Sequence, residues 1–113
     1  MLPAAVRLTS GESFRRGVRE GRRAGSRTLV LHLSLLDPEA DSPRVGFVVG
    51  RAVGGAVVRN RVRRRLRHLV RDRLADLPPA STLVVRALAG AGEASYAELR
   101  RDLARCLERV TAS

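Results

Sequence analysis

The chain has 113 residues, a length typical of one domain, so we expect a single domain over residues 1–113. Its 22 basic residues are all arginine and outnumber its 11 acidic residues, giving a formal net charge of +11 that predicts a polyanionic partner. No apolar run approaches the roughly 18 residues of a membrane-spanning helix, residues 1–9 have no signal-peptide pattern, and Cys106 is the only cysteine. We therefore expect a cytoplasmic protein with no disulfide and no membrane partner.

The first predicted elements are a helix and a strand. Thr9 and Glu12 form a capping-box pattern at the start of a short helix over residues 12–20. Residues 28–36 then alternate with a period of two, which predicts a half-buried strand with leucines on one face. The opposite face of this strand carries Thr28, Val30, His32 and Ser34.

A turn and a second strand follow. Residues 37–43 contain two prolines and three acidic residues, which predicts an exposed turn. Residues 44–51, with β-branched and aromatic side chains, predict a strand that Gly54 and Gly55 bring to an end.

The C-terminal half predicts two helices around one more strand. Between residues 56 and 74, apolar residues recur at helical spacing, and Pro78 and Pro79 follow this helix. Residues 82–88 predict a strand that pairs parallel to residues 44–51. After a Gly/Ala loop at residues 89–94, Ser95 and Glu98 form a capping box for a last helix that buries Cys106. The fold class is therefore α+β, a two-layer sandwich.

The predicted helix over residues 56–74 carries most of the functional signal. Residues 59–73 hold eight arginines and one acid, Asp72. At about 100 degrees per residue, Asn60, Arg64, Arg67 and Arg71 lie opposite Val62, so one face is apolar and the other is basic. Acids that would make i,i+4 ion pairs are missing, and stacked like charges cost helix stability, so we interpret this face as a polyanion-binding surface and not as a merely solvated one.

The block at residues 44–68, RVGFVVGRAVGGAVVRNRVRRRLRH, resembles the signature of the bacterial ribonuclease P protein family. That motif is a strand followed by Gly-x-x-Val-Gly-x-Ala-Val-x-Arg-Asn-Arg and a basic helix. The matching residues here are Gly50, Val53, Gly54, Ala56, Val57, Arg59, Asn60 and Arg61. Residues 10–33 and 82–103 resemble the family's other elements.

The resemblance implies a fold and a function. The family order is αβββαβα, a small mixed sheet with an unusual left-handed βαβ crossover, and it adds a short strand near residues 22–25. The implied function is the protein subunit of ribonuclease P, which binds the catalytic RNA and precursor tRNA and assists Mg²⁺-dependent endonucleolytic removal of the tRNA 5′ leader. The active site, and most of the Mg²⁺, are then expected to belong to the RNA.

The resemblance also implies two RNA-binding surfaces. One contacts the catalytic RNA through Arg59, Asn60, Arg61, Arg63, Arg64 and Arg67. The other is a cleft for the single-stranded 5′ leader, formed by Phe14, Arg27, His32 and Arg51. Stacking surfaces beside basic groups suit single-stranded RNA. The family commonly has aromatic residues where Val18 and His32 stand, so stacking here is expected to be weaker.

Other classes of function fit the sequence less well. A nuclease that acts alone needs clustered carboxylates for Mg²⁺ or a His-based acid/base pair, whereas the acids of residues 37–43 occupy a predicted turn and His32 and His68 lie on different elements. We therefore predict no catalytic and no metal-binding residue in this chain. DNA binding would require a helix-turn-helix setting that a strand and two glycines do not provide. The remaining alternative is a structural RNA-binding protein of the ribosomal type.

Overall fold

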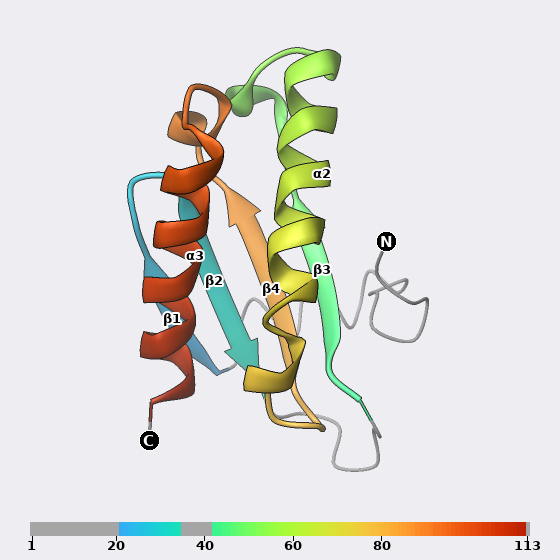
Figure 1. Cartoon of the computed structure of the whole chain (residues 1–113), viewed down its shortest axis with the longest axis vertical. Helices are drawn as coiled ribbons and strands as arrows, with labels where there is room; N and C mark the ends of the chain where they lie inside the picture. Colours follow the sequence, from blue (N-terminus) through green and yellow to red (C-terminus); the bar gives the residue numbers. More distant parts are fainter. Residues whose placement is uncertain (1–20, 35–41, 113) are drawn as a thin grey trace.

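The computed structural model describes residues 21–34 and 42–112, which form a mixed sheet covered on one face by two helices (Figure 1). The predicted helix over residues 12–20, residues 35–36 of the predicted strand and residues 37–41 of the predicted turn lie outside the described residues. The strands are β1 (Arg22–Gly25), β2 (Leu29–Ser34), β3 (Arg44–Val48) and β4 (Thr82–Ala87). The helices are α2 (Ala56–Arg71) and α3 (Tyr96–Thr111), with short 3-10 helices η2 (Arg51–Val53), η3 (Leu74–Asp76) and η4 (Ala89–Gly92).

The strands lie in the order β1-β2-β4-β3. β1 and β4 both pair antiparallel to β2, and β3 pairs parallel to β4. The parallel pairing predicted for the last strand is therefore confirmed, as is the short strand that the family resemblance added at residues 22–25.

The crossover from β3 through α2 to β4 is left-handed. In Figure 1, with the helices in front, the chain rises along β3, descends along α2 and rises again along β4, to the left of β3. Nearly all parallel crossovers have the opposite hand. The family resemblance predicted this exception, whereas general packing rules would not have done so.

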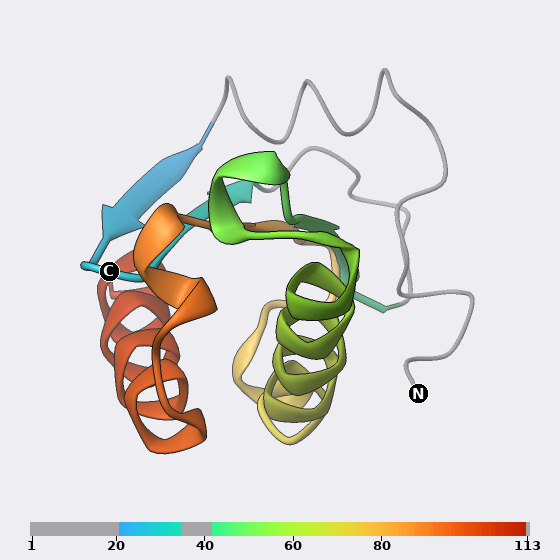
Figure 2. The same ribbon diagram turned by 90° about the horizontal axis from the view of Figure 1, so that it is seen from above.

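The core lies between the sheet and the two helices. On β2 the predicted alternation is confirmed, because Leu29, Leu31 and Leu33 belong to this core. α2 contributes Val62 and Leu66, which are both fully buried, and α3 contributes a stripe of buried residues. That stripe consists of Leu99, Leu103, Cys106, Leu107 and Val110. Figure 2 shows α2 and α3 side by side on the same side of the sheet.

One side chain and two boundaries differ from the prediction. Thr28 was predicted to share a face with His32, but its hydroxyl donates a 2.6 Å hydrogen bond to the buried Asp102 carboxylate of α3. That prediction is wrong because Thr28 precedes β2, where strand alternation does not apply. β3 ends at Val48, beyond which the chain turns into η2, and α2 ends at Arg71, beyond which it turns toward η3.

Candidate nucleic-acid interface

The entry to α2 depends on one glycine. Gly54 has a φ of 151°, and a Cβ there would lie 2.9 Å from Cβ of Val58, so only glycine fits this position without strain. The helix then begins at Ala56 with no capping side chain and no acidic residue in its first turn. This start exposes Val57, whose 81% exposure is unique among the large apolar side chains of the described residues.

The outer face of α2, made of Asn60, Arg64, Arg67 and Arg71, points away from the sheet as predicted. Asn60, Arg64 and Arg71 are exposed and Arg67 is half-buried. Arg64 and Arg67 make no hydrogen bond or ion pair to any other described residue. Within the part of the chain that the structure describes, their guanidinium groups are therefore unpaired.

A second set of α2 arginines bonds within the protein, which the sequence did not predict. Arg61 donates from Nη2 to the Gly92 carbonyl at 3.1 Å, and Arg65 donates from Nη1 to the Ala94 carbonyl at 3.3 Å. The first bond joins α2 to the end of η4, and the second joins it to the segment between η4 and α3. The acceptors lie 31 and 29 residues away in sequence, so helical periodicity carries no signal for them.

The three residues of the Arg-Asn-Arg motif, Arg59, Asn60 and Arg61, therefore lie in different environments. Asn60 is exposed and accepts a 3.2 Å hydrogen bond at Oδ1 from Arg63, which also reaches the Val49 carbonyl at 3.4 Å. Arg59 and Arg61 are half-buried, and the Nε atom of each is buried without a hydrogen-bond partner. Only the outward parts of these two side chains are left for a partner.

The sheet face turned away from the helices, which we call the second face, carries basic side chains around a buried apolar centre formed by Val30 and Val84. Its central residue is His32, which lies opposite Arg23 of β1 and Val84 of β4. Val30, on the same side of β2, lies opposite the exposed Arg86. Sequence reasoning missed Arg23 and Arg86, because only the strand register reveals that they share a face with His32.

The pKa of His32 is lowered below its usual value of 6.5, first by burial and then by the positive charges of Arg23 and Arg86. The imidazole is therefore neutral at pH 7. A neutral ring has one donor and one acceptor nitrogen and a face on which a base can stack.

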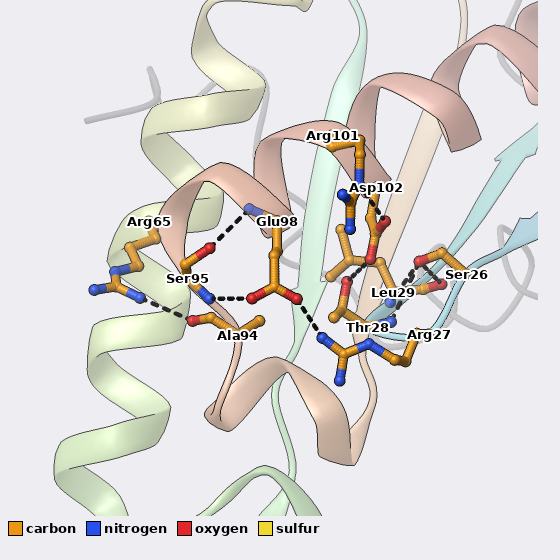
Figure 3. Close-up of polar contacts among 10 residues, drawn as sticks. All are labelled: Ser26, Arg27, Thr28, Leu29, Arg65, Ala94, Ser95, Glu98, Arg101 and Asp102. Carbon is orange, nitrogen blue, oxygen red and sulfur yellow. Dashed lines mark hydrogen bonds and ion pairs between the residues drawn. The ribbon is translucent and has the colours of Figure 1, made fainter.

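The other predicted cleft residues lie elsewhere. Arg27 donates from Nη2 to the Glu98 carboxylate at the start of α3, so its guanidinium lies on the helix side of the sheet, away from His32 (Figure 3). Arg51 is exposed in η2, beyond the end of β3. Phe14 and Val18 lie outside the described residues. The structure therefore does not bring Arg27 and His32 into one cleft.

Figure 3 shows how Glu98 connects several elements. Its backbone NH donates to the Ser95 hydroxyl at 3.1 Å while its carboxylate accepts from the Ser95 backbone NH at 3.2 Å, which confirms the predicted capping box. The Ser95 backbone NH and Arg27 lower the pKa of Glu98 below its usual range. This carboxylate is thus occupied by α3 and Arg27.

The described residues offer neither a metal site nor a membrane-spanning helix. Within residues 21–34 and 42–112, no three His, Cys, Asp or Glu side chains gather closely enough to hold a metal ion. Neither α2 nor α3 is long and apolar enough to cross a membrane.

The fold and its charges define a class of protein: a small, strongly basic α+β protein with a left-handed crossover and an arginine-rich helix. The sequence matches the family model described as ribonuclease P over residues 2–111. It is 60% identical to the ribonuclease P protein component of a Nocardioides species, covering 99% of this chain and 97% of that one. It is 56% identical to the ribonuclease P protein component of Streptomyces griseus, with coverages of 97% and 95%.

Solved structures agree on the fold. The ribonuclease P protein of Thermotoga maritima matches with a TM-score of 0.77 and 25% identity, covering 92% of this chain and 96% of that one. A Staphylococcus aureus ribonuclease P protein, a mutant with defective mRNA degradation activity, matches with a TM-score of 0.83 and 24% identity over 92% of this chain and 86% of that one. The chain belongs to the ribonuclease P protein component family, whose members are subunits of an RNA–protein complex that processes tRNA. The ribosomal-type alternative is not favoured.

Proposed function

We propose that this protein assembles with the catalytic RNA of ribonuclease P through the outer face of α2. It contributes positive charge and shape there, and the RNA supplies the reacting groups and holds most of the Mg²⁺. A cytoplasmic location, where precursor tRNA is processed in bacteria, is part of this proposal.

The main observation behind this proposal is the charge of α2, which contains seven arginines and no acidic residue. On its outer face, Arg64 and Arg67 have no partner among the described residues, and Val62 and Leu66 on the inner face fix the orientation of the helix. Guanidinium groups held on a rigid helix bind phosphates and release condensed counterions from RNA. Arg59, Asn60 and Arg63 flank this surface and extend it.

Arg61 has a partly different role from the one predicted for it. Its Nη2 atom positions α2 against the Gly92 carbonyl, so only the remaining guanidinium nitrogen faces solvent or RNA. Replacing Arg61 therefore tests packing and RNA binding together, whereas replacing Arg64 or Arg67 tests RNA binding alone.

The double variant Arg64→Ala/Arg67→Ala is expected to bind the catalytic RNA more weakly and with a flatter salt dependence. Each lost phosphate contact removes about 0.7 to 0.9 from the slope of log K against log salt concentration. The measurement is RNA binding over a series of monovalent salt concentrations, with thermal unfolding as the folding check. Arg61→Ala is the contrast, because it should also lower the melting temperature. An unchanged slope in the double variant would rule out this face as the RNA contact.

We propose in addition that the second face of the sheet binds the single-stranded 5′ leader of precursor tRNA. Arg23 and Arg86 flank the His32 ring on this face, and basic groups beside a stacking surface suit single-stranded RNA. Phe14, if it faces the same surface, would add a second stacking group. Arg51 remains a predicted contact beyond the end of β3, whereas Arg27, whose guanidinium is paired with Glu98 on the helix side, is not assigned to this face.

Replacing Arg86 with Ala is expected to weaken holoenzyme binding to precursor tRNA that carries a leader, by a factor that corresponds to roughly 1 kcal/mol or less. Binding of mature tRNA and assembly with the catalytic RNA should not change, because the leader is absent from both. His32→Ala is a second probe, with the Arg64→Ala/Arg67→Ala protein as the control that affects assembly instead. Equal losses for leader-bearing and leaderless tRNA would contradict leader binding by this face.

A further inference from the structure

A second row of arginines lies on α3, outside both surfaces described so far. Arg101, Arg105 and Arg109 are all exposed and follow one another at intervals of four residues, about 6 Å along the helix axis. We call them the α3 arginine row. Arg109 donates from Nη1 to the Gly25 carbonyl of β1 at 3.4 Å, so the row lies on the β1 side of the helix.

The acidic residues of α3 do little to neutralise this row. Of the three acidic residues of α3, Glu98 is engaged with the helix cap and Arg27, and Asp102 is only 6% exposed and accepts the hydrogen bond from Thr28. Glu108, three residues after Arg105, is exposed and makes no ion pair to any other described residue. Arg101 approaches Asp102 from outside, at 3.8 Å. Arg105 has no hydrogen bond or ion pair to any other described residue. Like charges four residues apart destabilise a helix, so the row is unfavourable for the protein alone.

Arg22 continues the row past the end of α3. It pairs with Leu33, which belongs to the core on the helix side, so its side chain is on the same side of the sheet as α3. Together with Val110 and Thr111 of α3, it lines a surface cavity of about 350 Å³. Positive charge therefore extends along the whole length of this flank.

This flank is separate from the outer face of α2. In Figure 1, α3 covers the β1 and β2 side of the sheet, while α2 covers the β4 and β3 side. Both helices belong to one layer, as Figure 2 shows. The α3 arginine row lies on the β1 side of that layer, whereas the outer face of α2 points away from the sheet.

We propose that the α3 arginine row, together with Arg22, binds the phosphate backbone of a second RNA segment. The inference rests on the proposed function, because it assumes that the protein works within an RNA complex. Arg101 forms one ion pair with Asp102, whereas Arg105 has none, and regularly spaced guanidinium groups with so little acidic compensation fit a repeating phosphate chain. That backbone belongs either to another part of the catalytic RNA or to the body of the tRNA.

The test is Arg105→Ala in the full-length protein, with Arg100→Ala as the matched control. Both changes remove one exposed charge from the same helix, but Arg100 lies four residues after Tyr96, whose ring contacts His68 of α2, and so faces the other flank. Two equilibria are measured against salt concentration: protein binding to the catalytic RNA, and holoenzyme binding to mature tRNA. Arg105→Ala should reduce the slope by about 0.7 to 0.9 in one of them, with an affinity loss of about three- to tenfold at low salt.

The assay that responds identifies the source of the phosphates: the catalytic RNA in the first case and the tRNA body in the second. The inference is overturned if Arg105→Ala matches the unaltered protein in both assays, or if Arg100→Ala has the same effect. The Arg64→Ala/Arg67→Ala protein, measured in parallel, separates this result from the proposed function. If only the Arg64→Ala/Arg67→Ala protein shows altered RNA binding, the proposed function is supported and only the α3 contact is refuted.

Discussion

Without RNA, the protein will leave precursor tRNA uncut at every Mg²⁺ concentration, while its addition to the catalytic RNA will accelerate 5′ cleavage at low Mg²⁺ by about tenfold or more. The first part is expected because a metal-dependent phosphoryl transfer needs clustered ligands, and residues 21–34 and 42–112 contain no such cluster, while the acidic residues at 37–41 belong to a predicted turn. The second part follows because a protein with a net charge of +11 offsets the repulsion between two RNA molecules, which Mg²⁺ must otherwise screen.

The measurement is single-turnover cleavage of end-labelled precursor tRNA over a Mg²⁺ series, with protein alone, RNA alone and both together. Protein freed of RNA by nuclease digestion and repurification serves as the critical sample. Specific 5′ cleavage by that sample would overturn the assignment of the chemistry to RNA. An equal acceleration by an unrelated basic protein would instead show that net charge alone is sufficient.

Gly92→Ala is expected to lower the free energy of unfolding by about 1 to 3 kcal/mol, roughly 4 to 12 °C in melting temperature. A Cβ at Gly92 would lie 2.1 Å from the carbonyl oxygen of Val53, so η4 and η2 would have to separate. The backbone carbonyl of Gly92 also accepts the hydrogen bond from Arg61 of α2, so the packing of α2 should loosen as well.

The control for this prediction is Gly50→Ala. A Cβ at Gly50 would meet nothing within 4 Å, and the φ of −90° at this position suits any residue. The free energy of unfolding of the Gly50→Ala protein should therefore change by less than about 1 kcal/mol. Thermal and denaturant unfolding of both variants give the comparison. Equal stability of the two variants would show that η2 and η4 separate at no cost, and the role of Gly92 as a close contact would have to be abandoned.

The sequence was most informative where a pattern is local. Helical periodicity predicted α2 and α3, and Ser95 with Glu98 marked the start of α3, because a capping box is defined by four consecutive residues. β1 gave no such signal, since only Ala24 of its four residues is buried, and it was found through the family resemblance alone.

The site was harder to predict because its contacts are long-range. The outer face of α2 follows from the helical wheel, but the inward bonds of Arg61 and Arg65 depend on where the carbonyls of Gly92 and Ala94 lie in space. In the same way, Arg86 becomes a neighbour of His32 only through the register of β4 against β2. The family resemblance implied that Arg27 lies at the leader cleft, whereas in the structure Arg27 is paired with Glu98. No local pattern reveals this ion pair, because the two residues are 71 positions apart in sequence.

The hand of the crossover decides which RNA surfaces this protein can have. If the strands kept their order and the connection from β3 to β4 took the common right-handed path, α2 would lie across the other side of the sheet. Its apolar stripe, Val62 and Leu66, would then cover His32 and Arg86, and the side now packed on α2 would be open to water. The right-handed path would thus remove the second face as a candidate RNA surface, a change that no single residue substitution could make.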